Sequence, residues 1–130
     1  MSTQPEQLKA RTKQFAIRIL RVFKGFPNSD EARIIGKQRL RAGTSVAANY
    51  RAVCRSRSKA EFISKMSVVV EEADETAFWL ELLIETSIIP EARLRELLAE
   101  ANELLAIFAA SLWTARQKRK SQTLNVSKTQ

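Results

Sequence analysis

The chain has 130 residues, of which 45% are hydrophobic and 28% charged, with only three Gly and three Pro. This length suits one domain with one buried core, and the scarcity of turn residues excludes a many-turned β fold and a disordered chain. Because 22 Lys and Arg stand against 14 Asp and Glu, the net charge of +8 favours a partner such as nucleic acid or an anionic membrane surface, although a basic surface also serves solubility alone.

The N-terminus and the single cysteine indicate the compartment. Cys54 cannot form an internal disulfide, and the first residues contain no apolar signal-peptide core. We therefore expect a loose leader at residues 1–5 and a cytoplasmic protein. No apolar run approaches the roughly 20 residues that cross a bilayer, so we expect no membrane insertion. Without a histidine to act as a base, Cys54 is interpreted as a small buried hydrophobe.

Apolar residues at spacings of four and three predict a first helix from about residue 6 to residue 25. Its buried line consists of Leu8, Thr12, Phe15, Ile19, Val22 and Phe26. A second line on this helix carries three positive charges, Arg11, Arg18 and Arg21. A turn is predicted next, because Gly25 suits a helix end and Pro27 cannot continue the helix.

The second helix is predicted from Asp30 to about Cys54. Its core line contains the polar residues Arg39 and Asn49 among apolar ones, and Asn49 is interpreted as a core hydrogen-bonding group. Gly43 is unfavourable in a helix by about 1 kcal/mol relative to Ala, which indicates that another helix approaches closely there. A third line, interleaved with small residues, carries the positive charges of Lys37, Arg41, Arg51 and Arg55.

Two further helices follow. Ser58, with Glu61 three residues later, has the capping-box pattern and predicts a third helix that runs to about Ser87. Pro90 is acceptable in the first turn of a fourth helix, whose apolar pattern leads us to place its end near Arg116. The segment 118–130 is polar and without periodicity, so we predict a disordered basic tail there.

These patterns predict an all-α fold, an up-down-up-down antiparallel four-helix bundle over residues 6–117. Charge is segregated along it: residues 1–57 hold 13 Lys and Arg against three acids, whereas residues 58–105 hold four against 11. An antiparallel turn near residue 57 places position 42 level with 72, and 39 with 75. We therefore expect Arg39 to pair internally with an acid of the third helix and Arg41 to stay at the surface.

Several chemistries are excluded by residue type. The absence of His excludes His-based triads and most zinc sites, and no Gly-rich phosphate loop occurs. Four acids of the third helix point in different directions, so we expect no metal site: Glu71, Glu72, Asp74 and Glu75. With no nucleophile beside a base and no cofactor motif, we expect no enzyme and no cofactor. Three aromatic residues are interpreted as core or subunit-interface residues: Phe78, Trp79 and Trp113.

Three blocks of sequence resemble a known family: 39–51 (RLRAGTSVAANYR), 58–65 (SKAEFISK) and 72–83 (EADETAFWLELL). The family is the bacterial four-helix-bundle family encoded in intervening sequences of 23S ribosomal RNA genes, and the resemblance covers roughly residues 15–112. It is similar in fold to the accessory variability protein of diversity-generating retroelements, a ring-like pentamer that binds nucleic acid and a reverse transcriptase. The resemblance therefore implies a homopentamer.

Our prediction is a non-enzymatic, homo-oligomeric protein that binds structured RNA through phosphate contacts on its first two helices. The predicted contact residues are Arg11, Arg18, Arg21, Lys37, Arg41, Arg51, Arg55 and Arg57. The alternative is a protein-interaction scaffold that uses no nucleic acid. In that alternative, the basic half of one subunit docks onto the acidic third helix of a neighbour or of another protein.

Overall fold

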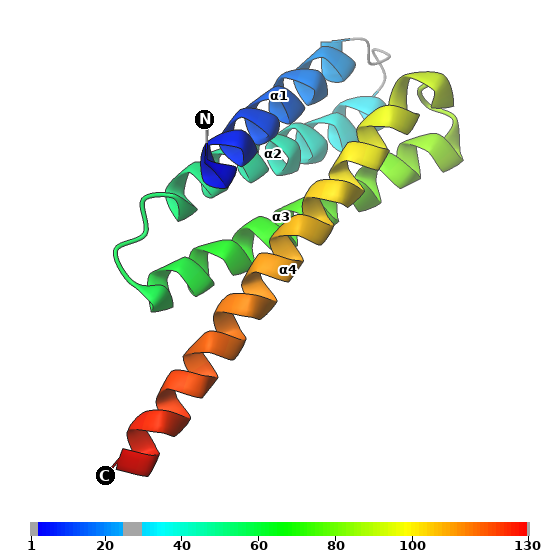
Figure 1. Cartoon of the computed structure of the whole chain (residues 1–130). Coiled ribbons are helices and arrows are strands. Elements are labelled where there is room, and N and C mark those ends of the chain that lie inside the picture. Colours follow the sequence, from blue (N-terminus) through cyan, green and yellow to red (C-terminus); the bar gives the residue numbers. More distant parts are fainter. Residues whose placement is uncertain (1–2, 25–29, 130) are drawn as a thin grey trace.

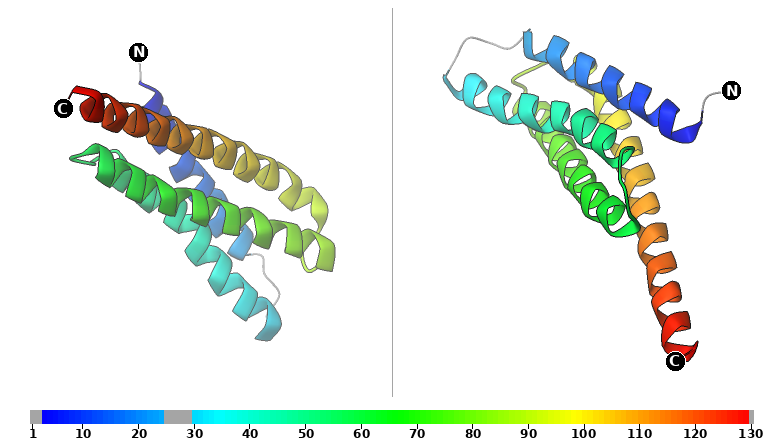
Figure 2. Two further views of the ribbon diagram at one scale, coloured as in Figure 1. Left: turned by 90° about the horizontal axis from the view of Figure 1, so that it is seen from below. Right: turned by 90° about the vertical axis from the view of Figure 1, so that its left-hand side faces the viewer.

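A computed structural model describes residues 3–24 and 30–129, which form four α-helices and no strand (Figure 1). The helices are α1 (Gln4–Lys24), α2 (Asp30–Val53), α3 (Lys59–Thr86) and α4 (Glu91–Thr129). Each helix packs against its neighbours in the chain, and α1 also contacts α4. Figure 2 shows that the α1–α2 hairpin crosses the α3–α4 hairpin. The predicted all-α four-helix bundle is confirmed.

The predicted cap of α3 is present. Ser58 has an extended backbone (φ −150°, ψ 164°), and its Oγ accepts a hydrogen bond of 3.1 Å from the backbone N–H of Glu61. The Glu61 carboxylate in turn accepts a bond of 3.3 Å from the backbone N–H of Arg57, one residue before the cap. The predicted turn between Gly25 and Asp30, by contrast, lies mostly outside the described residues.

At its start, α1 differs from the expected loose leader at residues 1–5. The helix begins at Gln4. Thr3 and Glu6 cap it reciprocally: the Thr3 N–H donates to Glu6 Oε2 at 3.1 Å, and the Glu6 N–H donates to Thr3 Oγ1 at 3.3 Å. Pro5 fits because the first turn of a helix needs no backbone N–H from it.

The C-terminal segment also differs from the prediction, because α4 continues to Thr129 instead of ending near Arg116. No Gly or Pro follows Pro90 in the sequence, so nothing in the backbone stops the helix. Side chains from 116 to 124 are all exposed. The extension therefore projects beyond the bundle without adding to its core, as Figure 1 shows.

The core is built from the predicted apolar lines of all four helices. Its largest fully buried side chains include Phe15, Ile19, Val46, Val69, Leu80, Leu83, Leu94, Leu97, Leu104 and Phe108. Thr12 is buried in the same line, and its hydroxyl donates to the backbone oxygen of Lys9 at 3.0 Å. Asn49, interpreted as a core residue, is only half-buried.

The interpretations of three single residues change. Phe78 and Trp113 are 55% and 65% exposed, so of their two expected roles the core is excluded and the subunit interface stays a prediction, whereas Trp79 is half-buried. Cys54 is exposed and is therefore not the buried hydrophobe that was expected. It lies just past the end of α2, where the backbone turns away from the core.

Gly43 is buried where α2 packs closely against Ile19 of α1. A Cβ atom on this residue would lie 2.9 Å from Cγ1 of Ile19. The predicted packing reason for glycine in mid-helix is thus confirmed. Ala47 and Ala48, which follow Gly43 on α2, also have short side chains and lie beside Ala10 of α1.

One stretch of α4, Glu91–Leu124, is long and apolar enough by length and composition to cross a membrane. Its apolar residues recur every three or four positions between Leu94 and Leu112, and those positions are buried in the bundle. The core helix of a bundle has this same pattern.

Candidate nucleic-acid interface

Small side chains on α1 and α2 leave a groove between the outer sides of these helices. The groove has a volume of about 490 Å³ and is lined by Lys9, Ala10, Lys13, Ala47, Ala48 and Arg51. We call it the α1–α2 groove. Its floor is made of alanine, and its rim carries three exposed cationic side chains with no acidic residue among the described residues that line it.

The groove is suited to a phosphodiester backbone. Lysine ammonium and arginine guanidinium groups carry several N–H donors and stay charged at neutral pH, so each can bind a phosphate oxygen. Within the described part of the chain, the ion pairs involve other cations, Arg11, Lys65 and Arg95. Among the residues that the structure describes, the three rim cations therefore have no carboxylate within ion-pair distance. The alanine floor lets a partner backbone approach closely.

Most of the predicted contact residues of α2 lie where the sequence placed them. Lys37, Arg41, Arg51 and Arg55 are exposed, and so is Arg57 in the turn after α2. Of these, only Arg51 lines the α1–α2 groove. Lys37 and Arg41 lie nearer the start of α2, and Arg55 and Arg57 lie past its end.

Arg41 lies on the side of α2 that faces α3. Together with Ala42, Glu72 and Glu75, it lines a small pocket of about 230 Å³. This confirms the prediction that position 42 of α2 lies opposite position 72 of α3. Burial raises the pKa of Glu72, and the charges of Glu75 and Glu71 add to this, whereas Arg41 opposes it. The side chain of Arg39 lies outside the described part of the chain, so its internal role stays a prediction.

The predicted arginines of α1 lie on the other flank of that helix. Arg11 forms a two-pronged pair with α4: its Nη2 lies 2.5 Å from Glu100 Oε1, and its Nε lies 3.3 Å from Glu100 Oε2. Its Nη2 also lies 3.2 Å from Glu103 Oε1. The hydrogen bond to Glu100 is the main cause that raises the pKa of Arg11. Arg11 thus links α1 to α4.

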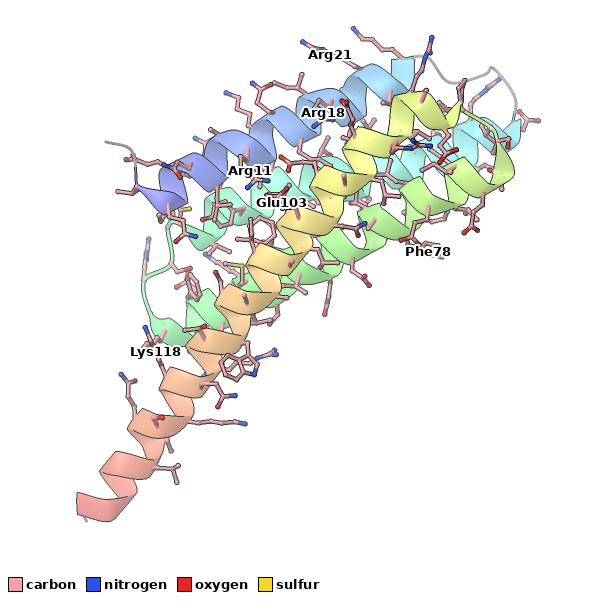
Figure 3. The ribbon with its side chains drawn as sticks, turned by 45° about the vertical axis from the view of Figure 1, so that its right-hand side comes forward. Arg11, Arg18, Arg21, Phe78, Glu103 and Lys118 are labelled. Atoms are coloured by element: carbon pink, nitrogen blue, oxygen red, sulfur yellow. The ribbon has the colours of Figure 1, made fainter. Side chains whose placement is uncertain are left out.

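Arg18 and Arg21 follow Arg11 along α1 (Figure 3). Arg18 is half-buried and Arg21 is exposed. By helical spacing, Arg18 lies in line with Arg11, whereas Lys9 and Lys13 fall on the flank that faces α2. The structure therefore divides the positive charge of α1 between two surfaces and does not bring all eight predicted residues together.

Sequence reasoning missed Lys9 and Lys13. They are four residues apart with Ala10 between them, which places both on one face of a helix beside a small residue. That spacing is the signal that could have identified them. Their position opposite Arg51 could be known only once α1 and α2 were packed together.

A second charged surface lies between α3 and α4. It is a groove of about 480 Å³ lined by Glu71, Asp74, Glu75, Ala77, Phe78, Glu81 and Asn102. We call it the acidic groove. Over the described residues, no group of three or more Cys, Asp or Glu side chains is arranged so that it could hold a metal ion.

Comparison with solved structures finds a close relative in fold. It is a crystal structure from Bacteroides thetaiotaomicron VPI-5482, described as a protein with unknown function from the S23 ribosomal protein family. The two share 32% sequence identity with a TM-score of 0.77, over 85% of this chain and 98% of that one. A comparison with curated proteins finds no match.

A family model matches the chain directly. The match covers residues 6–110, from the first turn of α1 to well into α4, and so includes nearly all of the bundle but not the projecting extension. This extent agrees with the fold and the three sequence blocks, and it places the chain in the family of the 23S rRNA-intervening sequence proteins.

Proposed function

We propose that this protein is a non-enzymatic, homo-oligomeric RNA-binding accessory protein, and that its α1–α2 groove holds the phosphate backbone of structured RNA. The observation that carries the proposal is the groove itself, with three exposed cations above an alanine floor and no acid among the described lining residues. The descriptions of the family and of the Bacteroides relative name no reaction.

The footprint that we propose is centred on Lys9, Lys13 and Arg51 and continues along α2 through Arg55 and Arg57. Contacts of this kind position RNA without reading its sequence. Arg11 stays outside the footprint because its guanidinium is bound to Glu100 and Glu103. Arg18, Arg21, Lys37 and Arg41 contribute positive potential from the neighbouring surfaces.

The test removes the three groove charges together, as Lys9→Gln, Lys13→Gln and Arg51→Gln. Fluorescence anisotropy of a labelled RNA hairpin measures affinity over a salt series. We expect the variant to bind at least about tenfold more weakly, with a log–log salt slope that is shallower by about 2 to 3, because each neutralised phosphate contributes about 0.7 to 0.9.

A matched control loses three exposed charges elsewhere, as Arg93→Gln, Arg95→Gln and Lys120→Gln. It should keep most of the affinity, because a change in net charge alone acts weakly through screened solvent. Equal weakening of both variants would show that binding depends only on net charge. Absence of RNA binding by the wild-type protein would overturn the proposal itself.

The alternative function is a protein scaffold, and the acidic groove favours it. The extension of α4 is basic, with exposed Arg116, Lys118, Arg119 and Lys120, and opposite charges on two surfaces of one chain can pair head to tail between copies. The exposed Phe78 lies in the acidic groove and supplies apolar contact area.

Light scattering coupled to gel filtration separates these possibilities. The proposed homo-oligomer, a pentamer by resemblance, should have a mass several times that of one chain. If charge pairing joins the copies, Glu71→Gln with Asp74→Asn should lower the mass. An oligomer without RNA affinity would favour the scaffold, whereas a monomer that binds RNA would exclude assembly between copies.

A further inference from the structure

A larger cavity lies at the end of the bundle where α1 begins and α2 turns into α3. Its volume is about 850 Å³, within the usual range for small-molecule sites. All four helices contribute to its walls, and it is lined by residues separate from those of the α1–α2 groove. We call it the end cavity.

The wall of the end cavity is largely apolar. Its main apolar contributors are Tyr50 and Val53 of α2, Phe62 of α3 and Ile107 and Ala110 of α4. Tyr50 and Val53 are almost fully buried, and the ring of Tyr50 rests against Phe108 in the core at a centroid distance of 5.2 Å. Tyr50 and Val53 thus anchor the wall in the core, and the half-buried Phe62 and Ile107 with the exposed Ala110 offer apolar surface to a ligand chain.

The charged groups of the cavity are all positive. Lys59, the first residue of α3, and Lys118 of α4 line it, and no Asp or Glu is among the described lining residues. Figure 3 shows Lys118 beside the start of α3. The N-terminus of α3 also favours an anion at this place, because the backbone N–H groups of its first turn carry partial positive charge.

Within the described part of the chain, one polar group that lines the cavity has no hydrogen-bond partner. The hydroxyl oxygen of Ser56 is buried and has no hydrogen-bond partner within the described part of the chain. A buried hydroxyl without a partner is unfavourable, so an acceptor atom bound beside it would be stabilised. Burial raises the pKa of the Tyr50 phenol, with Cys54 adding to the effect, so Tyr50 remains a neutral wall residue at physiological pH.

We propose that the end cavity binds an aliphatic carboxylate. Its hydrocarbon chain lies along the apolar wall, and its carboxylate is held by Lys59 and Lys118, with the Ser56 hydroxyl as a hydrogen-bond donor. The combination of an apolar wall, two cations and an unpaired donor selects for an anionic head on an apolar body. The site is independent of the RNA proposal, because none of its residues lines the α1–α2 groove.

Cys54 provides the assay, because it is the chain's single cysteine, is exposed and lines the end cavity. The rate at which the neutral reagent iodoacetamide alkylates Cys54 is measured with increasing octanoate or decanoate, below the concentrations at which these form micelles. We expect saturable protection of Cys54. The half-protection concentration should fall by about fourfold per added CH₂, because each buried CH₂ adds to the free energy of transfer.

Two comparisons test the head group. Decanol should protect at least about tenfold less well than decanoate, because it cannot pair with the two lysines. The variant Lys59→Gln with Lys118→Gln should weaken decanoate by at least about tenfold, while Lys9→Gln with Lys13→Gln, which removes the same charge from the other groove, should bind as the wild type does. Circular dichroism verifies that both variants remain helical.

Three results would overturn the proposal: no protection by decanoate, equal protection by decanol, or equal losses in the two double variants. Protection that rises with protein concentration in the absence of carboxylate would also overturn it, since a second copy of the chain would then be the occupant. RNA affinity is measured on the same variants. If the variant Lys9→Gln with Lys13→Gln loses RNA affinity but still binds decanoate, the α1–α2 groove and the end cavity are independent sites.

Discussion

The replacement Gly43→Ala tests how closely α1 and α2 pack. The new Cβ would lie 2.9 Å and 3.0 Å from Cγ1 and Cγ2 of Ile19 and 3.3 Å from its Cβ. Rotation of Ile19 cannot relieve all three contacts, because its branch point is one of them and its side chain is only 1% exposed. Overpacking of this kind costs about 1–3 kcal/mol, whereas Gly→Ala gains about 1 kcal/mol in a helix. We therefore expect a net loss of about 1 kcal/mol.

A double-mutant cycle with Ile19→Ala separates the two contributions. Ile19→Ala alone should cost about 2–5 kcal/mol, since it leaves a cavity in the core. In that background the clashing Cγ atoms are absent, so Gly43→Ala should now stabilise the protein by about 0.5–1 kcal/mol through helix propensity. The effect of the same substitution thus changes sign between backgrounds.

Urea unfolding followed by circular dichroism measures these free energies, with the slope m compared to confirm that the unfolded states are alike. Ala48→Gly, at an exposed position of α2, calibrates the propensity difference without a packing effect. If Gly43→Ala stabilised the wild-type protein, or had the same sign in both backgrounds, the packing argument would be refuted.

Three further predictions concern single features of the fold. Arg11→Gln leaves Glu100, whose side chain is only 20% exposed, without its cation, and should lower the free energy of unfolding by about 1 kcal/mol. Arg95→Gln, at the exposed pair with Glu91, should lower it by less than about 0.5 kcal/mol. Equal losses of the two variants in urea unfolding would contradict this. Burial, with Glu75 and Glu71, raises the folded-state pKa of Glu72 above its unfolded value, so its ionised form costs stability at neutral pH and this cost disappears as pH falls through the folded pKa. Glu72→Gln should therefore raise Tm at pH 7 by a margin that shrinks toward acid pH, and a margin independent of pH would count against it. Ending the chain after Lys120 should leave Tm unchanged, because residues 121–124 are exposed; a clear drop would show that the extension packs on the bundle.

Much of the fold could be predicted because its determinants are local. The line from Leu8 to Ile19 has the period of a helix with one buried face, and the Ser58 cap needs only residues three apart. The end of α4 could not be placed in this way. Loss of apolar periodicity after Leu112 marks where the helix leaves the core, and a helix without Gly or Pro can continue beyond that point.

The candidate site could be predicted only in part. Helical spacing shows which charges share one face of a helix, but the packing of the helices decides which faces meet. Arg51 and Arg55 share an outer line of α2 that spacing alone reveals. The separation of Arg11 from Lys9 and Lys13 depends on which helix packs on each flank of α1, and the partner of Arg11 lies 89 residues away. Hydropathy likewise could not reveal that Phe78 is exposed, since burial depends on the neighbouring helix.

The packing of each helix on its neighbours in the chain has a consequence for the order of folding. Over the described residues, only the contact between α1 and α4 joins helices that are distant in sequence. Local contacts lower the entropy lost before the transition state, so a bundle of this kind folds in microseconds to milliseconds. The two hairpins are then expected to form first, and the Arg11–Glu100 pair to close last. Loss of that pair would accelerate unfolding and leave the folding rate nearly unchanged.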